Sequence, residues 1–126
     1  MSLKIVFPEL SVTLLEPVAK KRAFLKEVAR VCGMNFVEVR GERLEDFACG
    51  QSSSVYDEAT ARAVGHLEEL LPLAGRCLKS GGEIFLWLSH QQASEVGHIY
   101  GGIKEAGRIS LPSGGQGEIW RGKRTL

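Results

Sequence analysis

The sequence is poor in cysteine and contains no long apolar run. Its three cysteines, Cys32, Cys49 and Cys77, include no CxxC pair, and an odd number cannot form a closed set of disulfides. We therefore expect reduced thiols that serve in packing rather than in metal binding, as in a cytoplasmic protein. No stretch reaches the roughly 18 apolar residues that a membrane helix needs, so no membrane partner is expected.

Net charge is also nearly absent. Lysine and arginine total 16 against 15 acidic residues, which gives a formal net charge of +1. The overall balance therefore does not indicate nucleic-acid binding, and any contact with RNA must come from local basic patches. The first residues leave no room for a signal peptide and enter patterned sequence at once, as if upstream chain were missing.

Short apolar runs alternate with helical patterns along the chain, which is typical of βα units around a parallel sheet. Strands are predicted at residues 12–16, 36–40, 55–61 and 83–88, the last of them buried on both faces. One helix is predicted to end at Gly33, and another covers residues 67–78 with a kink at Pro72. A chain of 126 residues with this pattern predicts a single α/β domain.

Four other segments have weaker patterns. Residues 3–7 fit either a strand or the last turn of a helix, and residues 43–47 fit a short helical turn or a loop. A turn is expected at residues 80–82, followed after the next strand by a helix over residues 91–105. Residues 109–111 and 118–121 are expected to pair in antiparallel fashion at the edge of the sheet.

Glu16 ends the first predicted strand, just before a helix. Ligands bind outside the carboxyl ends of parallel strands, and an acid there can accept two hydrogen bonds from a ribose diol. An acid at a helix start also complements the helix dipole, and its position alone favours neither interpretation.

Two later segments occupy equivalent positions. In the turn after the second strand, a backbone N–H near Leu44 and the carboxylate of Glu45 suit an adenine ring, although a capping acidic turn is the plainer interpretation. Arg62, after the third strand, suits a cofactor or an anionic RNA group, and a surface ion pair is the alternative.

Six segments together resemble one family. They are residues 8–10 (PEL), 13–16 (TLLE), 20–25 (KKRAFL), 43–47 (RLEDF), 60–64 (TARAV) and 71–82 (LPLAGRCLKSGG). Their order and spacing are similar to those of the small-subunit rRNA guanine-N7 methyltransferase family (RsmG, also called GidB) over about residues 3–88. No single motif is diagnostic, but the ordered set is fairly specific.

The resemblance implies a Rossmann-like class I methyltransferase fold with a mostly parallel sheet, and methyl transfer from S-adenosylmethionine to N7 of a guanine in small-subunit rRNA. Glu16 would meet the ribose hydroxyls, Leu44 and Glu45 the adenine, and Arg62 the cofactor or the substrate. No catalytic side chain and no metal are expected, because N7 already carries a lone pair and alignment provides most of the rate.

The resemblance also implies contacts with rRNA phosphates, which position the substrate without reading its sequence. Two basic clusters are the candidates: Lys20, Lys21 and Arg22, and, near the C-terminus, Arg121, Lys123 and Arg124. For the first cluster, a solvated helix face is the plainer interpretation.

The sequence departs from the family pattern at several places. The glycine-rich turn after the family's first strand is absent, so residues 1–126 are interpreted as one partial, N-terminally truncated methyltransferase domain, with residues 3–7 ending the helix after that turn. Glu58 replaces an apolar residue, and Ser89, followed by His90, stands where the family has lysine. These departures leave open a non-catalytic Rossmann-like module that binds RNA or a partner.

Overall fold

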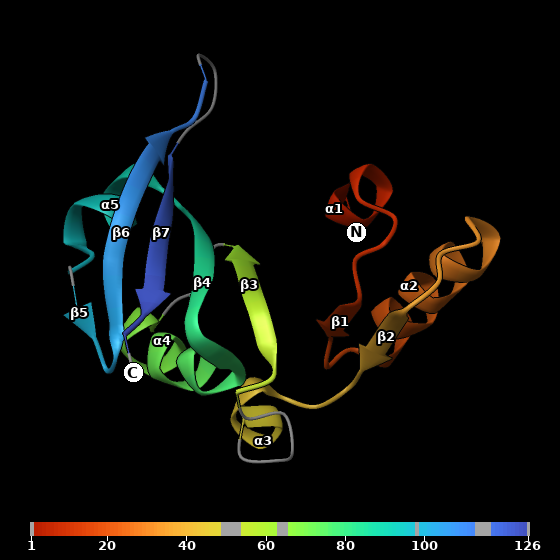
Figure 1. Cartoon of the computed structure of the whole chain (residues 1–126). Helices are drawn as coiled ribbons and strands as arrows, with labels where there is room; N and C mark the ends of the chain where they lie inside the picture. The colour runs from red at the N-terminus through yellow and green to blue at the C-terminus, as the bar shows by residue number, and fades with distance from the viewer. Residues whose placement is uncertain (1, 49–53, 63–65, 98, 113–116, 126) are drawn as a thin grey trace. The chain divides into compact units, whose positions relative to one another are not determined.

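The computed structural model describes residues 2–48, 54–62, 66–97, 99–112 and 117–125 (Figure 1). The chain divides into two compact units, Met1–Asp46 and Phe47–Leu126. In the described part of the chain, no helix combines the length and the apolar composition needed to cross a membrane.

The first unit is a βαβ crossover preceded by a short helix. It contains α1 (Ser2–Val6), β1 (Val12–Leu15), α2 (Ala19–Val31) and β2 (Val37–Arg40). The two strands pair in parallel, with Val12 opposite Val37 and Leu15 opposite Arg40. Parallel neighbours need a crossover connection, and α2 provides it. The predicted strands at residues 12–16 and 36–40 are confirmed, and α1 settles the choice at residues 3–7 in favour of a helix.

The glycine after α2 ends the helix as predicted. Gly33 has a φ of 62°, the left-handed conformation in which helices commonly end. The N–H of Met34 bonds to the carbonyl of Ala29 at 2.9 Å, which satisfies one of the last helical acceptors.

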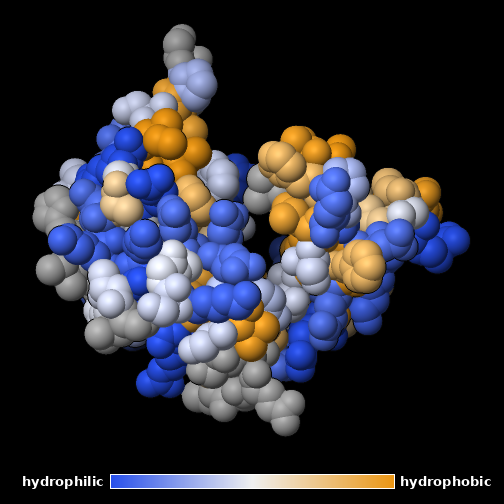
Figure 2. All heavy atoms as spheres, viewed as in Figure 1, coloured by the Kyte–Doolittle hydropathy of each residue, from blue (hydrophilic) through white to orange (hydrophobic). Residues whose placement is uncertain are grey.

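Hydrophobic side chains of the first unit lie largely at its surface. Phe24, Val31 and Phe36 are 68%, 67% and 73% exposed, and hydrophobic atoms are visible on this unit in Figure 2. All the buried hydrophobic side chains among the described residues lie in the second unit. The described residues of the first unit therefore form no closed hydrophobic core of their own.

The second unit contains a five-stranded sheet and two covering helices. The strand order is β3 (Tyr56–Arg62), β4 (Leu78–Leu88), β7 (Glu118–Arg124), β6 (Ile103–Ser110) and β5 (Ile99–Tyr100). The helices α4 (Leu67–Cys77) and α5 (His90–Glu95) both contact β4, and a short helix, α3 (Leu44–Ala48), spans the boundary between the units (Figure 1).

The sheet is mixed rather than parallel throughout. Strands β3 and β4 are parallel and joined by α4, whereas β4–β7, β7–β6 and β6–β5 are antiparallel. The predicted antiparallel pairing is confirmed, since Ile109 lies opposite Ile119. Its predicted place at the edge of the sheet is wrong for β7, which lies between β4 and β6. The α/β class is therefore confirmed, and the parallel pairing occurs where helical crossovers link the strands.

The core of the second unit lies on one face of β4. Ile84, Leu86 and Leu88 are buried, while Phe85 and Trp87, which point to the opposite face, are only half-buried. The prediction of a strand buried on both faces was therefore wrong. Glu58, which would be costly if buried without a partner, is exposed on β3.

Helix α4 runs through Pro72 as one element. Two other local predictions need correction. The expected turn at residues 80–82 lies inside β4, where Gly81 has a φ of 80° and the register with β3 shifts between Tyr56 and Glu58. Such a shift is typical of a β-bulge, in which extra residues are left unpaired.

The helix predicted over residues 91–105 ends at Glu95. Gly101 and Gly102 have φ angles of 44° and 90° and form the turn between β5 and β6. The buried Ile103 then begins β6, so an apolar residue that fitted the helical spacing belongs to a strand.

Gly122 leaves room for the side chain two residues before it. A Cβ at this position would lie 2.5 Å from Trp120 Cζ3 and 2.6 Å from Ile103 Cγ2. Because this site is in the packed core, we expect Gly122→Ala to lower the free energy of unfolding by about 1–3 kcal/mol. Urea denaturation checks the prediction. Gly107→Ala is the control, since its Cβ would meet nothing nearer than 3.9 Å, and an equal loss in both variants would contradict the packing argument.

Candidate cofactor-binding site

The carboxyl ends of β1 and β2 lie side by side in the first unit. The N–H of Glu16 donates to the carbonyl oxygen of Arg40 at 2.9 Å, so the parallel ladder continues to this residue. The chain after β2 then leads through Gly41 to Leu44, the first residue of α3. The structure therefore brings together, at one edge of the strand pair, Glu16 and the segment leading to Leu44 and Glu45.

The Glu16 carboxylate is already held at one oxygen. Its Oε1 accepts a hydrogen bond from the N–H of Val18 at 3.1 Å, at the start of α2. Its Oε2 has no hydrogen-bond partner among the described residues. Both interpretations from the sequence therefore fit: one oxygen serves the helix start, and the other is left to accept a hydrogen bond from a ligand.

The turn after β2 contains several acids in different situations. Glu42 is occupied, because Arg40 Nε donates to its Oε1 at 2.7 Å. Glu45 and Asp46 lie in the first turn of α3, as a capping acidic turn would have them. Leu44 is half-buried and the next residue, Glu45, is exposed, so an apolar side chain is followed directly by an accessible carboxylate.

Arg62 lies in the second unit, at the carboxyl end of β3. It is opposite Trp87 in the parallel register with β4. Its side chain is exposed and has no ion pair with any described residue, so the alternative of a surface ion pair is not observed in the described part of the chain. Ser89 follows the end of β4, and Glu118 of β7 lies opposite Leu88, so all three residues share one edge of this sheet.

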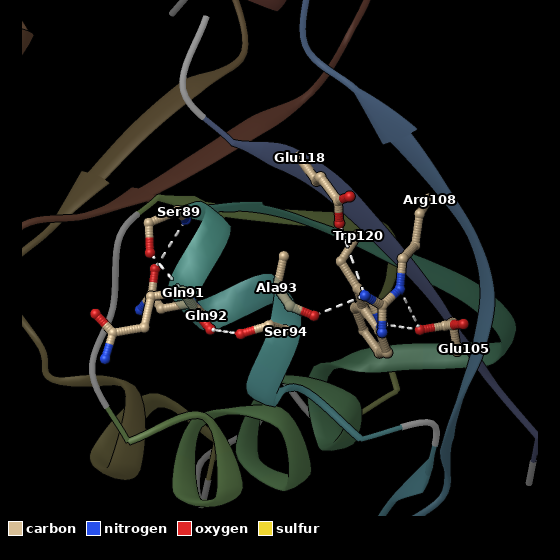
Figure 3. A network of polar contacts seen from close by, with 9 residues as sticks. All are labelled: Ser89, Gln91, Gln92, Ala93, Ser94, Glu105, Arg108, Glu118 and Trp120. Carbon is tan, nitrogen blue, oxygen red and sulfur yellow. Dashed lines mark hydrogen bonds and ion pairs between the residues drawn. The ribbon is translucent and has the colours of Figure 1, made fainter.

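A polar network fixes the helix that begins at this edge (Figure 3). At its start, Ser89 and Gln92 form a capping box in which each side chain accepts from the other's backbone N–H at 3.1 Å. At its end, Arg108 Nη1 donates to the carbonyl oxygen of Ala93 at 2.7 Å. A serine followed three residues later by a glutamine is the sequence signal of such a cap, although no cap was predicted there.

Arg108 belongs to a larger polar arrangement. Its Nε donates to Glu105 Oε1 at 2.8 Å, and Trp120 Nε1 donates to the same oxygen at 2.6 Å. Glu118 Oε2 lies 3.7 Å from Arg108 Nη1 and is buried. These contacts join α5 to β6 and β7, and therefore hold the position of Ser89 at the end of β4 (Figure 3).

The two basic clusters differ in how free their side chains are. Lys20, Lys21 and Lys123 are exposed. The guanidinium of Arg22 instead donates to the carbonyl oxygens of Glu16 and Pro17 at 3.0 and 2.8 Å. In the second cluster, Arg121 lies 3.3 Å from the Glu83 carboxylate, and Arg124 donates to Ser54 Oγ at 3.0 Å.

Lys123 of the second cluster lies well away from Arg62 along the sheet. Arg62 is opposite Trp87, whereas strand β7 runs antiparallel to β4 and places Lys123 opposite Glu83. Glu83 and Trp87 are four residues apart, which corresponds to about 13 Å along a strand at ~3.3 Å per residue.

The cysteines and histidines form no separate site in the described residues. Cys77 is buried, and this burial raises the pKa of its thiol, whereas Cys32 is exposed. Cys49 lies outside the described residues. No group of three or more side chains suited to holding a metal ion occurs within the ranges that the structure describes. His66 precedes α4 and His90 begins α5, and both are exposed.

Sequence comparison identifies a family that matches most of the chain. The profile described as rRNA small subunit methyltransferase G matches residues 1–102. A ribosomal RNA small subunit methyltransferase G from Sorangium cellulosum is 40% identical over 95 residues, covering 75% of this chain and 39% of that protein. The Staphylococcus haemolyticus protein of the same name is 34% identical over 107 residues, covering 85% and 45%. The chain thus spans about half the length of the curated relatives it matches, or less.

Solved structures support the same fold at low sequence identity. A putative methyltransferase, yhhF, from Escherichia coli superposes with a TM-score of 0.77 at 14% identity, covering all of this chain (100%) and 71% of that one. M. jannaschii TYW2, solved in complex with AdoMet, gives a TM-score of 0.65 at 17% identity, covering 89% and 56%. These similarities confirm the class I methyltransferase fold.

Proposed function

Because the chain belongs to the rRNA small subunit methyltransferase G family, we propose that it takes part in S-adenosylmethionine-dependent methyl transfer to N7 of a guanine in small-subunit rRNA. The family match runs across the boundary between the two units, and the yhhF superposition covers the whole chain. Both support our proposal that residues 1–126 are one partial methyltransferase domain, which we place in the cytoplasm with the rRNA.

The observation that carries this proposal is the Glu16 carboxylate at the end of β1. One of its oxygens is fixed by the Val18 N–H, and the other has no partner among the described residues, so the carboxylate is oriented before any ligand arrives. The second oxygen can therefore accept a hydrogen bond from a ribose hydroxyl of S-adenosylmethionine. Leu44 and Glu45 would then contact the adenine.

The bound cofactor supplies a methyl group on a positively charged sulfur. The side chains of this chain bind and orient it, and no proton has to leave guanine N7 when the new bond to carbon forms. The rate of methyl transfer then depends mainly on how the cofactor and the guanine are aligned, so we assign no catalytic base. Arg62, exposed at the end of β3, would contact the cofactor or hold an anionic group of the RNA with its planar guanidinium.

We propose that the two basic clusters contact rRNA phosphates, mainly through the exposed Lys20, Lys21 and Lys123. Arg22, Arg121 and Arg124 add positive charge nearby, but their guanidinium groups already bond to protein atoms. These three arginines would therefore contribute through the local field more than through direct contacts.

Calorimetric titration with S-adenosylmethionine tests the cofactor role. Glu16→Gln keeps an oxygen to accept from Val18 but replaces the other acceptor with a donor, so we expect binding about tenfold weaker, as for a lost charged hydrogen bond. Glu9→Gln, an exposed acid in the turn before β1, should bind like the wild type. A full-length curated relative serves as the positive control.

A second candidate function is a non-catalytic module that binds RNA or a partner. The observation that favours it is the exposed hydrophobic surface of the first unit, including Phe24 and Phe36. If wild type and Glu16→Gln both fail to bind S-adenosylmethionine while the chain shows salt-dependent binding of rRNA, this second function replaces the first.

A further inference from the structure

Arg22 bonds to the backbone directly after β1. It lies in the second turn of α2, and its Nη1 donates to the carbonyl oxygens of Glu16 at 3.0 Å and Pro17 at 2.8 Å. Its side chain is half-buried, unlike those of its exposed neighbours Lys20 and Lys21. One guanidinium therefore satisfies two consecutive carbonyl groups at the place where the chain leaves the strand.

The same guanidinium covers the backbone directly after β2. A Cβ built on Gly41 would lie 2.8 Å from both Arg22 Cζ and Nη1, and 3.1 Å from Nε. Gly41 is not among the glycines with positive φ, so its backbone conformation suits any residue. A side chain at position 41 would therefore displace the Arg22 guanidinium from the space that it occupies.

We propose that Arg22 is a positioning residue for the cofactor site, and that the lack of a side chain at Gly41 leaves the space in which its guanidinium lies. Arg22 hydrogen-bonds to the segment that follows β1, lies against Gly41 after β2, and fixes the backbone of Glu16, whose carboxylate is held separately by Val18. This inference rests on the proposed function, because it assumes that Glu16 binds the ribose. It also gives Arg22 a role different from that of a phosphate contact.

The two residues make a double-substitution test possible. Arg22→Ala removes the donor, and Gly41→Ala places a methyl group where the guanidinium lies, so each should weaken S-adenosylmethionine binding about tenfold. Once Arg22 is alanine, the space beside Gly41 is vacant. The double variant should therefore bind no more weakly than Arg22→Ala alone. Arg30→Ala is the matched control, since that arginine lies on the same helix and is exposed, with its Nε 3.1 Å from Glu27.

A second readout needs no cofactor. The N–H groups of Glu16 and Val18 donate to Arg40 and to Glu16 Oε1, so their hydrogen-exchange rates report whether this segment is held. We expect both amides to exchange about tenfold faster in Arg22→Ala and Gly41→Ala, and at the wild-type rate in Arg30→Ala. Arg22→Lys keeps the charge but lacks the flat guanidinium, so it should give an intermediate rate and serves if the alanine variant does not fold.

The outcomes separate this inference from the proposed function. If the wild type does not bind S-adenosylmethionine, the proposed function fails, and the exchange rates still decide whether Arg22 holds the two segments. Additive losses in the double variant would overturn the inference. So would unchanged amide exchange in Arg22→Ala together with a weaker, less salt-dependent affinity for rRNA, which is the result expected of a phosphate contact.

Discussion

Replacing Trp120 with alanine should lower the free energy of unfolding by about 3–5 kcal/mol, the usual range for removing a fully buried tryptophan. Trp120 is 0% exposed, and its ring lies against the positions of Gly122 and Ile103 in the core of the second unit. The substitution removes this packing and also the donor to Glu105, whose carboxylate keeps Arg108 as its partner. Urea denaturation followed by circular dichroism measures the change.

Two variants separate the contributions to this loss. Trp120→Phe keeps an aromatic ring and removes the Nε1 donor, so it loses less packing but still loses one charged hydrogen bond. It should therefore lower the free energy of unfolding by about 1–2 kcal/mol less than Trp120→Ala does. Trp87→Ala, at a half-buried position of the neighbouring strand, should cost clearly less than Trp120→Ala. If Trp87→Ala and Trp120→Ala were equally destabilising, the core would not lie on the face of β4 that we describe.

Replacing Gly117 with alanine should lower the free energy of unfolding by about 2–5 kcal/mol, because a Cβ there would cause both backbone strain and a steric clash. Gly117 has a φ of 146°, which side chains rarely allow, and a Cβ there would fall on the carbonyl oxygen of Leu88 and 3.1 Å from its carbon. Backbone atoms cannot yield as a flexible side chain does. The carboxyl end of β4 and the following Ser89 must therefore move, or β7 must shift away.

Gly81→Ala separates strain from collision. Gly81 also has a positive φ, 80°, but a Cβ there would meet only Lys123 Cε, at 3.9 Å. It should therefore lower the free energy of unfolding by only about 1–2 kcal/mol, the usual penalty for a residue with a Cβ in a left-handed conformation. Thermal or urea unfolding of the two variants gives the comparison, and equal losses would show that the contact with Leu88 is unimportant.

The sequence was sufficient to predict the alternation of strands and helices in the first unit. There, the β-rich run at residues 12–16 and the glycine that ends α2 are local signals, and both elements formed as expected. The segment after β4 was not predictable in this way. Ile99 and Ile103 are four residues apart, a helical spacing, yet the left-handed glycines between them turn the chain into a strand pair.

The candidate site was predictable only in part, for a related physical reason. Glu16, Leu44 and Glu45 were identified because position along a βαβ unit fixes the edge at which a residue lies. The direction of a long side chain depends instead on tertiary neighbours. Arg22 was therefore grouped with Lys20 and Lys21 as a basic cluster, although its guanidinium turns back to the carbonyls of Glu16 and Pro17.

The direction of β7 sets how far an RNA would have to reach. Arg62 is opposite Trp87 and Lys123 is opposite Glu83, four residues away along β4, so a substrate that presented its base beside the first while a phosphate rested on the second would need an extended footprint. Under the proposed function, a folded rRNA segment would engage both residues, whereas a lone nucleotide would engage only one of them.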